Sequence, residues 1–261
     1  MLDYIQIFRD VLQRQKPHEY YELVTKEAKF NKQIYSGNGQ KEWLLSYREK
    51  ETKAQKEQRE RLTRTKTKHI CRKIENVFNE LRILDKAAMD IVSKNESKVQ
   101  GVKNWIYDIN LENFAFETVK YWNLIDANAF CVFGLNKYQD IEFSVIPSEM
   151  VYDYYTRSGR LQFLIIKIKR DDKTDYRLYS PNEVIDFKEG RDKEATEFVD
   201  NYTVYRTKCN VMYAFQLGWQ KNPETAFKTC VGIYEGANEL FKSLIWEGSE
   251  MDITKALHGI V

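Results

Sequence analysis

The chain has 261 residues, of which 43% are hydrophobic and 14% aromatic, so it can bury a sizeable core and lacks the composition of a disordered protein. Its formal net charge of +2 says little about binding partners, because a near-neutral total can hide a strongly basic segment. Its four cysteines are widely spaced and lack a CxxC pair, which argues against a zinc site and a disulfide scaffold, and no apolar run reaches the length of a membrane span.

Residues 1–40 are predicted to form an N-terminal helical segment. Apolar side chains recur at helical spacing on both sides of Pro17, and a proline at that place should separate one helix from the next. Ser36-Gly37-Asn38-Gly39 then predicts a turn.

Residues 41–128 are predicted to contain a long basic helix followed by further helices. From residue 41 to 73, twelve Lys or Arg stand against five Glu, and helical periodicity then continues from Ile70 to Ile91. The basic residues are densest from 59 to 73, where threonine hydroxyls lie between them. The candidate site residues there are Arg59, Arg61, Arg64, Lys66, Lys68, Arg72 and Lys73.

Two functions fit this basic stretch. Lys, Arg and Thr side chains suit a nucleic-acid backbone, which they would bind without reading its sequence. The same residues also suit a contact with an acidic neighbouring subunit, or a solvated helix face. The sequence leaves these alternatives open.

Residues 129–222 are predicted to form an antiparallel β-meander. Short apolar or aromatic runs alternate there with turn clusters such as Ser158-Gly159. Helix is expected again from Pro223 to Trp246, within a C-terminal segment of residues 223–261. The predicted strands are 129–135, 141–146, 151–155, 161–169, 176–179, 202–209 and 212–217.

The sequence predicts neither catalysis nor a cofactor. Its three histidines lack a metal-ligand spacing, and none is next to a plausible nucleophile. A metal-dependent nuclease would carry an acid two residues before a strand lysine, but Ile165 precedes Lys167. Tyr152, Tyr154 and Tyr155 could stack on bases, although neighbouring strand residues point to opposite faces and so favour packing.

The run Ile146-Pro-Ser-Glu-Met-Val-Tyr-Asp-Tyr-Tyr155, followed by Arg157-Ser158-Gly159 and the apolar run from Leu161 to Ile168, resembles the wing-region sheet of the portal proteins of tailed double-stranded DNA bacteriophages. In that family a strand, a Pro-Ser-Glu-type corner and a hairpin follow one another in this order. Further along, residues 240–258 resemble the lead-in to the portal stem. The resemblance covers most of residues 20–258.

The resemblance implies an α+β fold in which long helices pack on an antiparallel β-meander, truncated before the stem and clip. It also implies a non-enzymatic virion protein that assembles in the host cytoplasm into a ring, usually of twelve subunits, at one capsid vertex. The implied partners are capsid proteins, the packaging ATPase and double-stranded DNA, and no membrane. Such rings serve DNA packaging, DNA passage and head-tail joining.

The family continues into a stem, a clip and a crown, whereas this sequence ends at Val261. The chain is therefore expected to be either a fragment of a longer portal or one without the channel parts. The main alternative is a sequence-independent nucleic-acid-binding protein of a phage or mobile element that uses the basic stretch. A metal-dependent nuclease is a third possibility.

Overall fold

The structure is a computed structural model, and the chain divides into two compact units. The first unit contains Met1–Ala28 and Asn113–Gly232, and the second contains Lys29–Glu112 and Ile233–Val261. The described residues are 3–36, 52–54, 57, 94–108, 110–111, 114, 122, 124–135, 141–170, 173–188, 201–206, 211–218, 220–232, 234, 240 and 243.

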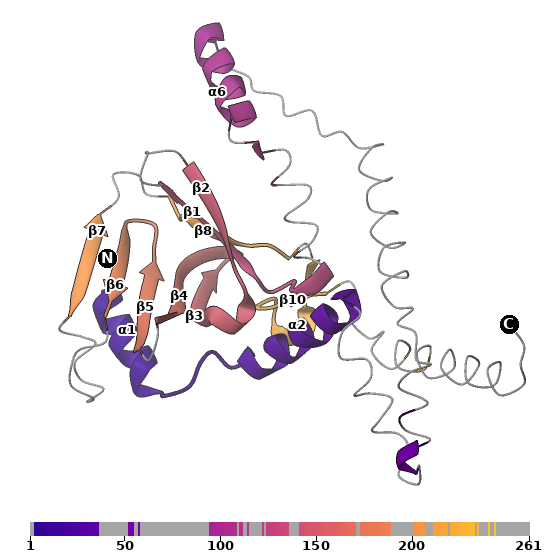
Figure 1. Cartoon of the computed structure of the whole chain (residues 1–261). Helices are drawn as coiled ribbons and strands as arrows, with labels where there is room; N and C mark the ends of the chain where they lie inside the picture. The colour runs from indigo at the N-terminus through magenta and orange to yellow at the C-terminus, as the bar shows by residue number, and fades with distance from the viewer. Residues whose placement is uncertain are drawn as a thin grey trace, which may run out of the picture. The chain divides into compact units, whose positions relative to one another are not determined.

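A five-stranded antiparallel sheet forms the largest part of the first unit (Figure 1). Its strands follow one another in chain order: β3 (Val151–Arg157), β4 (Arg160–Arg170), β5 (Lys173–Tyr179), β6 (Glu183–Phe187) and β7 (Tyr202–Arg206). Ser158 and Gly159 join the first two strands with φ of 50° and 74°. Two positive φ angles are typical of a type I′ hairpin turn, so the sequence Ser-Gly fits the predicted turn.

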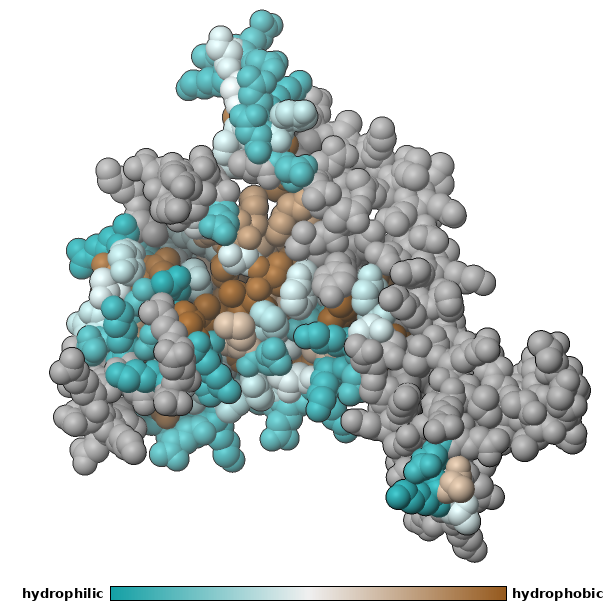
Figure 2. Space-filling model, viewed as in Figure 1, coloured by the Kyte–Doolittle hydropathy of each residue, from teal (hydrophilic) through white to brown (hydrophobic). Residues whose placement is uncertain are grey.

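A second, three-stranded antiparallel sheet has the order β2-β1-β8. It consists of β1 (Phe130–Leu135), β2 (Ile141–Ile146) and β8 (Ala214–Gln216). A short ribbon of β9 (Gln220–Lys221) and β10 (Cys230–Val231) follows. Figure 2 shows apolar side chains gathered in a patch, with hydrophilic ones to the left of it and below it.

Three helices are described. Helix α1 (Tyr4–Gln13) begins at Asp3, whose carboxylate accepts the backbone N–H groups of Ile5 and Gln6 and so caps the helix. Helix α2 (Tyr21–Ser36) follows Pro17 after a short linker, and α6 (Glu96–Asp108) belongs to the second unit and buries none of its side chains. Of the helices described, none is both long and apolar enough to cross a membrane.

Strand β4 is buried on both of its faces. Phe163 and Ile165 pack on one face with Phe8 of α1, and Leu164 and Ile166 pack on the other with residues of the three-stranded sheet. Because successive strand residues point to opposite faces, a strand buried on both sides is apolar without alternation. This explains the uninterrupted apolar run from Phe163 to Ile166.

A buried carboxylate fixes the corner between the two sheets. Ser148–Met150 forms a short 3-10 helix, η2, between β2 and β3. Asp126 accepts the backbone N–H of Ser148 at 2.7 Å and that of Asn128 at 3.1 Å. Burial raises the pKa of Asp126, although both hydrogen bonds act to lower it.

The predicted fold class, long helices packed on a β-meander, is wrong. The described part of the chain contains ten strands in three antiparallel sheets, and its longest helix has 16 residues. The physical reason is the two-sided burial of β4: the second face is covered by another sheet, where the prediction placed helices. Most of the predicted basic helix lies outside the described residues.

The helix predicted from Pro223 is also wrong at its start. Pro223–Thr225 is a single 3-10 turn, η4, and Cys230–Val231 is a strand. Ala226 and Phe227 have φ of 50° and 63°, which a right-handed helix does not allow.

Other predicted elements are confirmed. Helices lie on both sides of Pro17, and strands occupy the predicted positions from Phe130 to Arg206 and at Ala214–Gln216. Strand β6 was not predicted. The four-segment division at residues 40, 128 and 222 stays a prediction.

We expect Asp126→Ala to lower the free energy of unfolding by roughly 1–3 kcal/mol for each of the two N–H groups that it leaves buried without an acceptor. Urea denaturation followed by circular dichroism measures the change. Glu149→Ala, which alters an exposed side chain of the same corner, is the matched control and should change the stability by less than about 0.5 kcal/mol. Equal stability of Asp126→Ala and wild type would show that Asp126 does not fix the corner.

Candidate functional site

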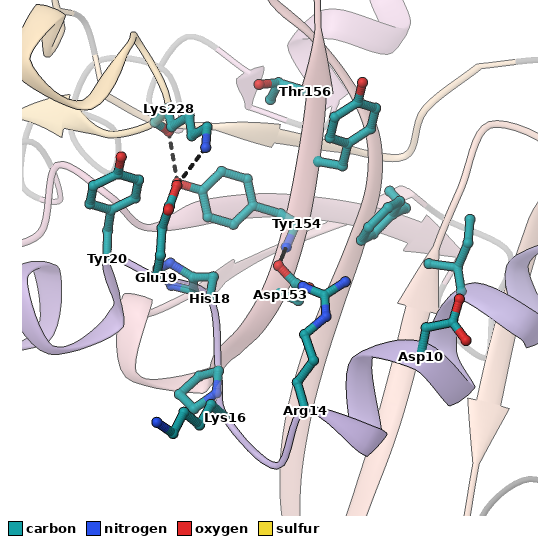
Figure 3. A pocket seen from close by; sticks show the side chains of 14 residues that line it. Asp10, Arg14, Lys16, His18, Glu19, Tyr20, Asp153, Tyr154, Thr156 and Lys228 are labelled. Carbon is teal, nitrogen blue, oxygen red and sulfur yellow. Dashed lines mark hydrogen bonds and ion pairs between the residues drawn. The ribbon is translucent and has the colours of Figure 1, made fainter.

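A pocket of about 740 Å³ lies in the first unit, between the α1–α2 linker and the outer strand of the five-stranded sheet (Figure 3). Four consecutive β3 residues, 153–156, line one side, and residues from α1 and the linker line the other. The complete lining is Ile7, Asp10, Arg14, Lys16, Pro17, His18, Glu19, Tyr20, Asp153, Tyr154, Tyr155, Thr156, Phe163 and Lys228.

Hydrogen bonds hold the elements around the pocket together. The backbone N–H of His18 donates to the carbonyl of Tyr152 at 2.9 Å, in the manner of a short additional strand. The hydroxyl of Tyr21 donates to the carbonyl of Glu149 at 3.0 Å. On the far side, the hydroxyl of Tyr154 donates to the backbone carbonyl of Lys228 at 2.7 Å.

The charged side chains of the pocket are largely paired with one another. Arg14 lies 3.6 Å from Asp153, and Lys228 donates to Glu19, as Figure 3 shows. The hydrogen bond from Lys228 lowers the pKa of Glu19, while burial raises the pKa of Asp153. Since Asp10 and Lys16 add one charge of each sign, the pocket has no strong preference for either anions or cations.

His18 forms the buried end of the pocket. Its ring makes edge contacts with Tyr154, at 5.1 Å between ring centroids, and with Tyr21, at 5.9 Å. Burial lowers the pKa of His18 to about 4, so the imidazole is neutral near pH 7. Its Nδ1 atom is buried without a hydrogen-bond partner.

The lining residues favour binding over covalent chemistry. They include no serine or cysteine, and the hydroxyl of Tyr154, whose pKa is raised by burial, is hydrogen-bonded to a backbone carbonyl. Within the described ranges, no group of three or more His, Cys, Asp and Glu side chains lies close enough to hold a metal ion. What the pocket offers is a strand edge with aromatic and charged side chains around it.

The grouping of the predicted site residues stays a prediction. Arg59, Arg61, Arg64, Lys66, Lys68, Arg72 and Lys73 all lie outside the described residues. Ile165 occupies the position where a metal-dependent nuclease would carry an acidic residue, and it is fully buried in the core. The tyrosines pack as the sequence favours: Tyr152 against Tyr176, Tyr154 against Phe130, and Tyr155 against Phe163.

Sequence reasoning missed the pocket because its residues come from three distant parts of the chain. Arg14 and His18 meet Asp153 and Lys228 only in the folded state. Only one local indication existed: the segment Lys16-Pro17-His18-Glu19-Tyr20 combines charged and aromatic residues in a short linker between two helices.

No protein-family model and no curated protein matches this chain. The interpretation of the pocket therefore depends on the chain's own geometry.

We expect the depressed pKa of His18 to make the fold less stable in acid. The folded state favours the neutral imidazole. The fold therefore has its full stability above the unfolded-state pKa of 6.5, where the imidazole is neutral in both states, and loses stability as the pH falls towards about 4. Denaturation of wild type and of His18→Gln should therefore show a difference in unfolding free energy that shrinks over this interval.

An NMR titration of the imidazole provides a second measurement. A His18 midpoint near 6.5 would contradict its burial.

Proposed function

We propose that this chain is a structural subunit of a portal-like ring at the capsid vertex of a tailed bacteriophage. In this role it serves DNA packaging, DNA passage and head-tail joining through assembly and not through catalysis. Its partners are further copies of itself, capsid and packaging ATPase proteins, and double-stranded DNA.

The observation that best supports this proposal is the order of strand, corner and hairpin from β2 to β4. Strand β2 ends at Ile146, the Pro-Ser-Glu corner forms η2, and β3 and β4 form a tight hairpin. These are the pieces on which the resemblance to portal proteins depends. The corner is not a loose loop, because the buried Asp126 carboxylate accepts the N–H of Ser148.

The chemistry of the pocket also supports an assembly role. Its acids and bases are engaged with each other in the pairs Arg14–Asp153 and Lys228–Glu19. A general base usually has a pKa near the working pH, whereas His18 is neutral with a pKa of about 4. Such a pocket is better suited to holding a chain segment than to moving a proton.

We expect the purified chain to form a closed cyclic homo-oligomer. Ring subunits use two different surfaces that meet head to tail, and closure yields a single discrete mass. Native mass spectrometry and negative-stain electron microscopy measure that mass and shape over a range of protein concentrations. A monomer at every concentration would count decisively against the proposal.

The basic stretch supports a second candidate function, sequence-independent binding of nucleic acid. If this stretch contacts phosphates through Arg59, Arg61, Arg64, Lys66 and Lys68, binding to duplex DNA should weaken steeply with salt. Each lost contact should reduce the slope of the logarithm of the binding constant against the logarithm of the salt concentration by about 0.9.

Replacing these five residues with Gln should weaken binding to unrelated duplexes equally, as measured by fluorescence anisotropy. The matched control replaces five Lys or Arg residues outside residues 59–73. An unchanged affinity and slope would remove the DNA role from this stretch. A tightly binding monomer would favour this candidate over the ring.

A further inference from the structure

The five-stranded sheet has two outer strands. In the part of the chain that the structure describes, β3 and β7 are hydrogen-bonded to a neighbouring strand on one side only. An outer strand exposes backbone N–H and C=O groups that can pair with another strand, and native proteins usually protect such edges. The two edges differ in how they are protected.

The outward groups of β7 follow from its pairing with β6. The N–H of Lys188 donates to the carbonyl of Asn201 at 3.0 Å, so Asn201 faces β6. In an antiparallel pair successive residues alternate, and Tyr202, Val204 and Arg206 therefore direct their backbone groups away from β6. This edge carries no proline or lysine, and its Tyr202 and Tyr205 side chains are 42% and 54% exposed.

The outward groups of β3 face the pocket. The carbonyl of Tyr152 accepts from His18, and the N–H of Tyr154 donates to the carboxylate of Asp153 at 2.8 Å, so the even-numbered residues point away from β4. The register shifts between Tyr155 and Thr156, but Arg157 pairs with Arg160 across the two-residue turn, so its neighbour Thr156 also points its backbone groups away from β4. Thr156 lines the pocket. The linker and Asp153 thus protect the start of the β3 edge, and the edge opens at Thr156.

We propose that β7 of one copy of this chain adds to the open β3 edge of a second copy, in the pocket. The contact would pair β7 with the part of the β3 edge that opens at Thr156. It joins two different surfaces of identical chains, which is the head-to-tail arrangement that generates a ring when it closes. The inference therefore rests on the proposed function and names the surfaces that carry it.

Charges of both signs lie at each of the two edges. On β7, the Arg206 side chain is 85% exposed and lies 3.8 Å from Glu183 of the neighbouring strand. In the pocket, Asp10 accepts a hydrogen bond from the neutral amide of Gln6, and Lys16 is exposed. Each edge thus presents one acid and one base, which suits a second copy better than a polyanion such as DNA.

Proline substitutions test each edge separately. Val204→Pro removes an outward N–H of β7, and Thr156→Pro removes one of β3; a strand edge tolerates proline where its N–H faces away from the sheet. Val204→Ala and Thr156→Ala are the matched controls, because they trim the same side chains and keep the N–H. Circular dichroism and thermal melts verify that all four variants fold.

We expect both proline variants to be monomers in native mass spectrometry, while both alanine controls keep the wild-type mass. Each proline variant retains one intact edge, so an equimolar mixture of the two should form a 1:1 heterodimer and no larger species. Only a contact between two different edges predicts such a heterodimer.

The outcomes separate the two proposals. Rings that persist in both proline variants would overturn the edge contact and leave the ring proposal intact. Open chains or dimers of the wild type that both prolines abolish would support the edge contact and overturn the ring. A mixture of monomeric variants that yields no heterodimer would also overturn the edge contact.

Discussion

The burial of both faces of β4 is the constraint on which the first unit depends. Phe163 and Ile165 need α1 as a cover, and Leu164 and Ile166 need the three-stranded sheet. Full burial of an aliphatic or aromatic side chain contributes about 1.5–3 kcal/mol, so these four residues outweigh any single hydrogen bond of the unit. Its two edges pair with β3 and β5, the strands that precede and follow it in the chain.

The pocket is a consequence of the same packing. Phe8 stacks on Phe187, at 3.7 Å between ring centroids, and holds α1 against the sheet. The linker that leaves α1 must then pass along β3, where His18 donates to Tyr152. The linker protects the first part of the edge and leaves the part at Thr156 open. Stability of the core and exposure of a binding edge therefore have one origin, the position of α1.

Local patterns of the sequence predicted what local physics determines. Pro17 separates two helices, Ser158-Gly159 makes a hairpin turn, and the apolar run around Leu164 is a strand. The sequence did not reveal what covers the second face of that strand, because a continuous apolar run fits burial against helices and burial against a sheet equally well. The turn at Ala226 was missed because proline at residue 223 also suits the start of a helix.

The pocket was beyond prediction because its far wall is fixed by long-range contacts. Asn128 bonds both backbone groups of Cys230, at 2.7 and 3.0 Å, and a side chain at position 218 would collide with the Ala127 carbonyl, so glycine is required there. These contacts place the turn that presents the Lys228 carbonyl to Tyr154. Both walls of the pocket are thus held before any partner arrives. A preorganised edge avoids the entropy cost of ordering a loop, which makes strand addition at β3 more favourable than it would be on a mobile edge.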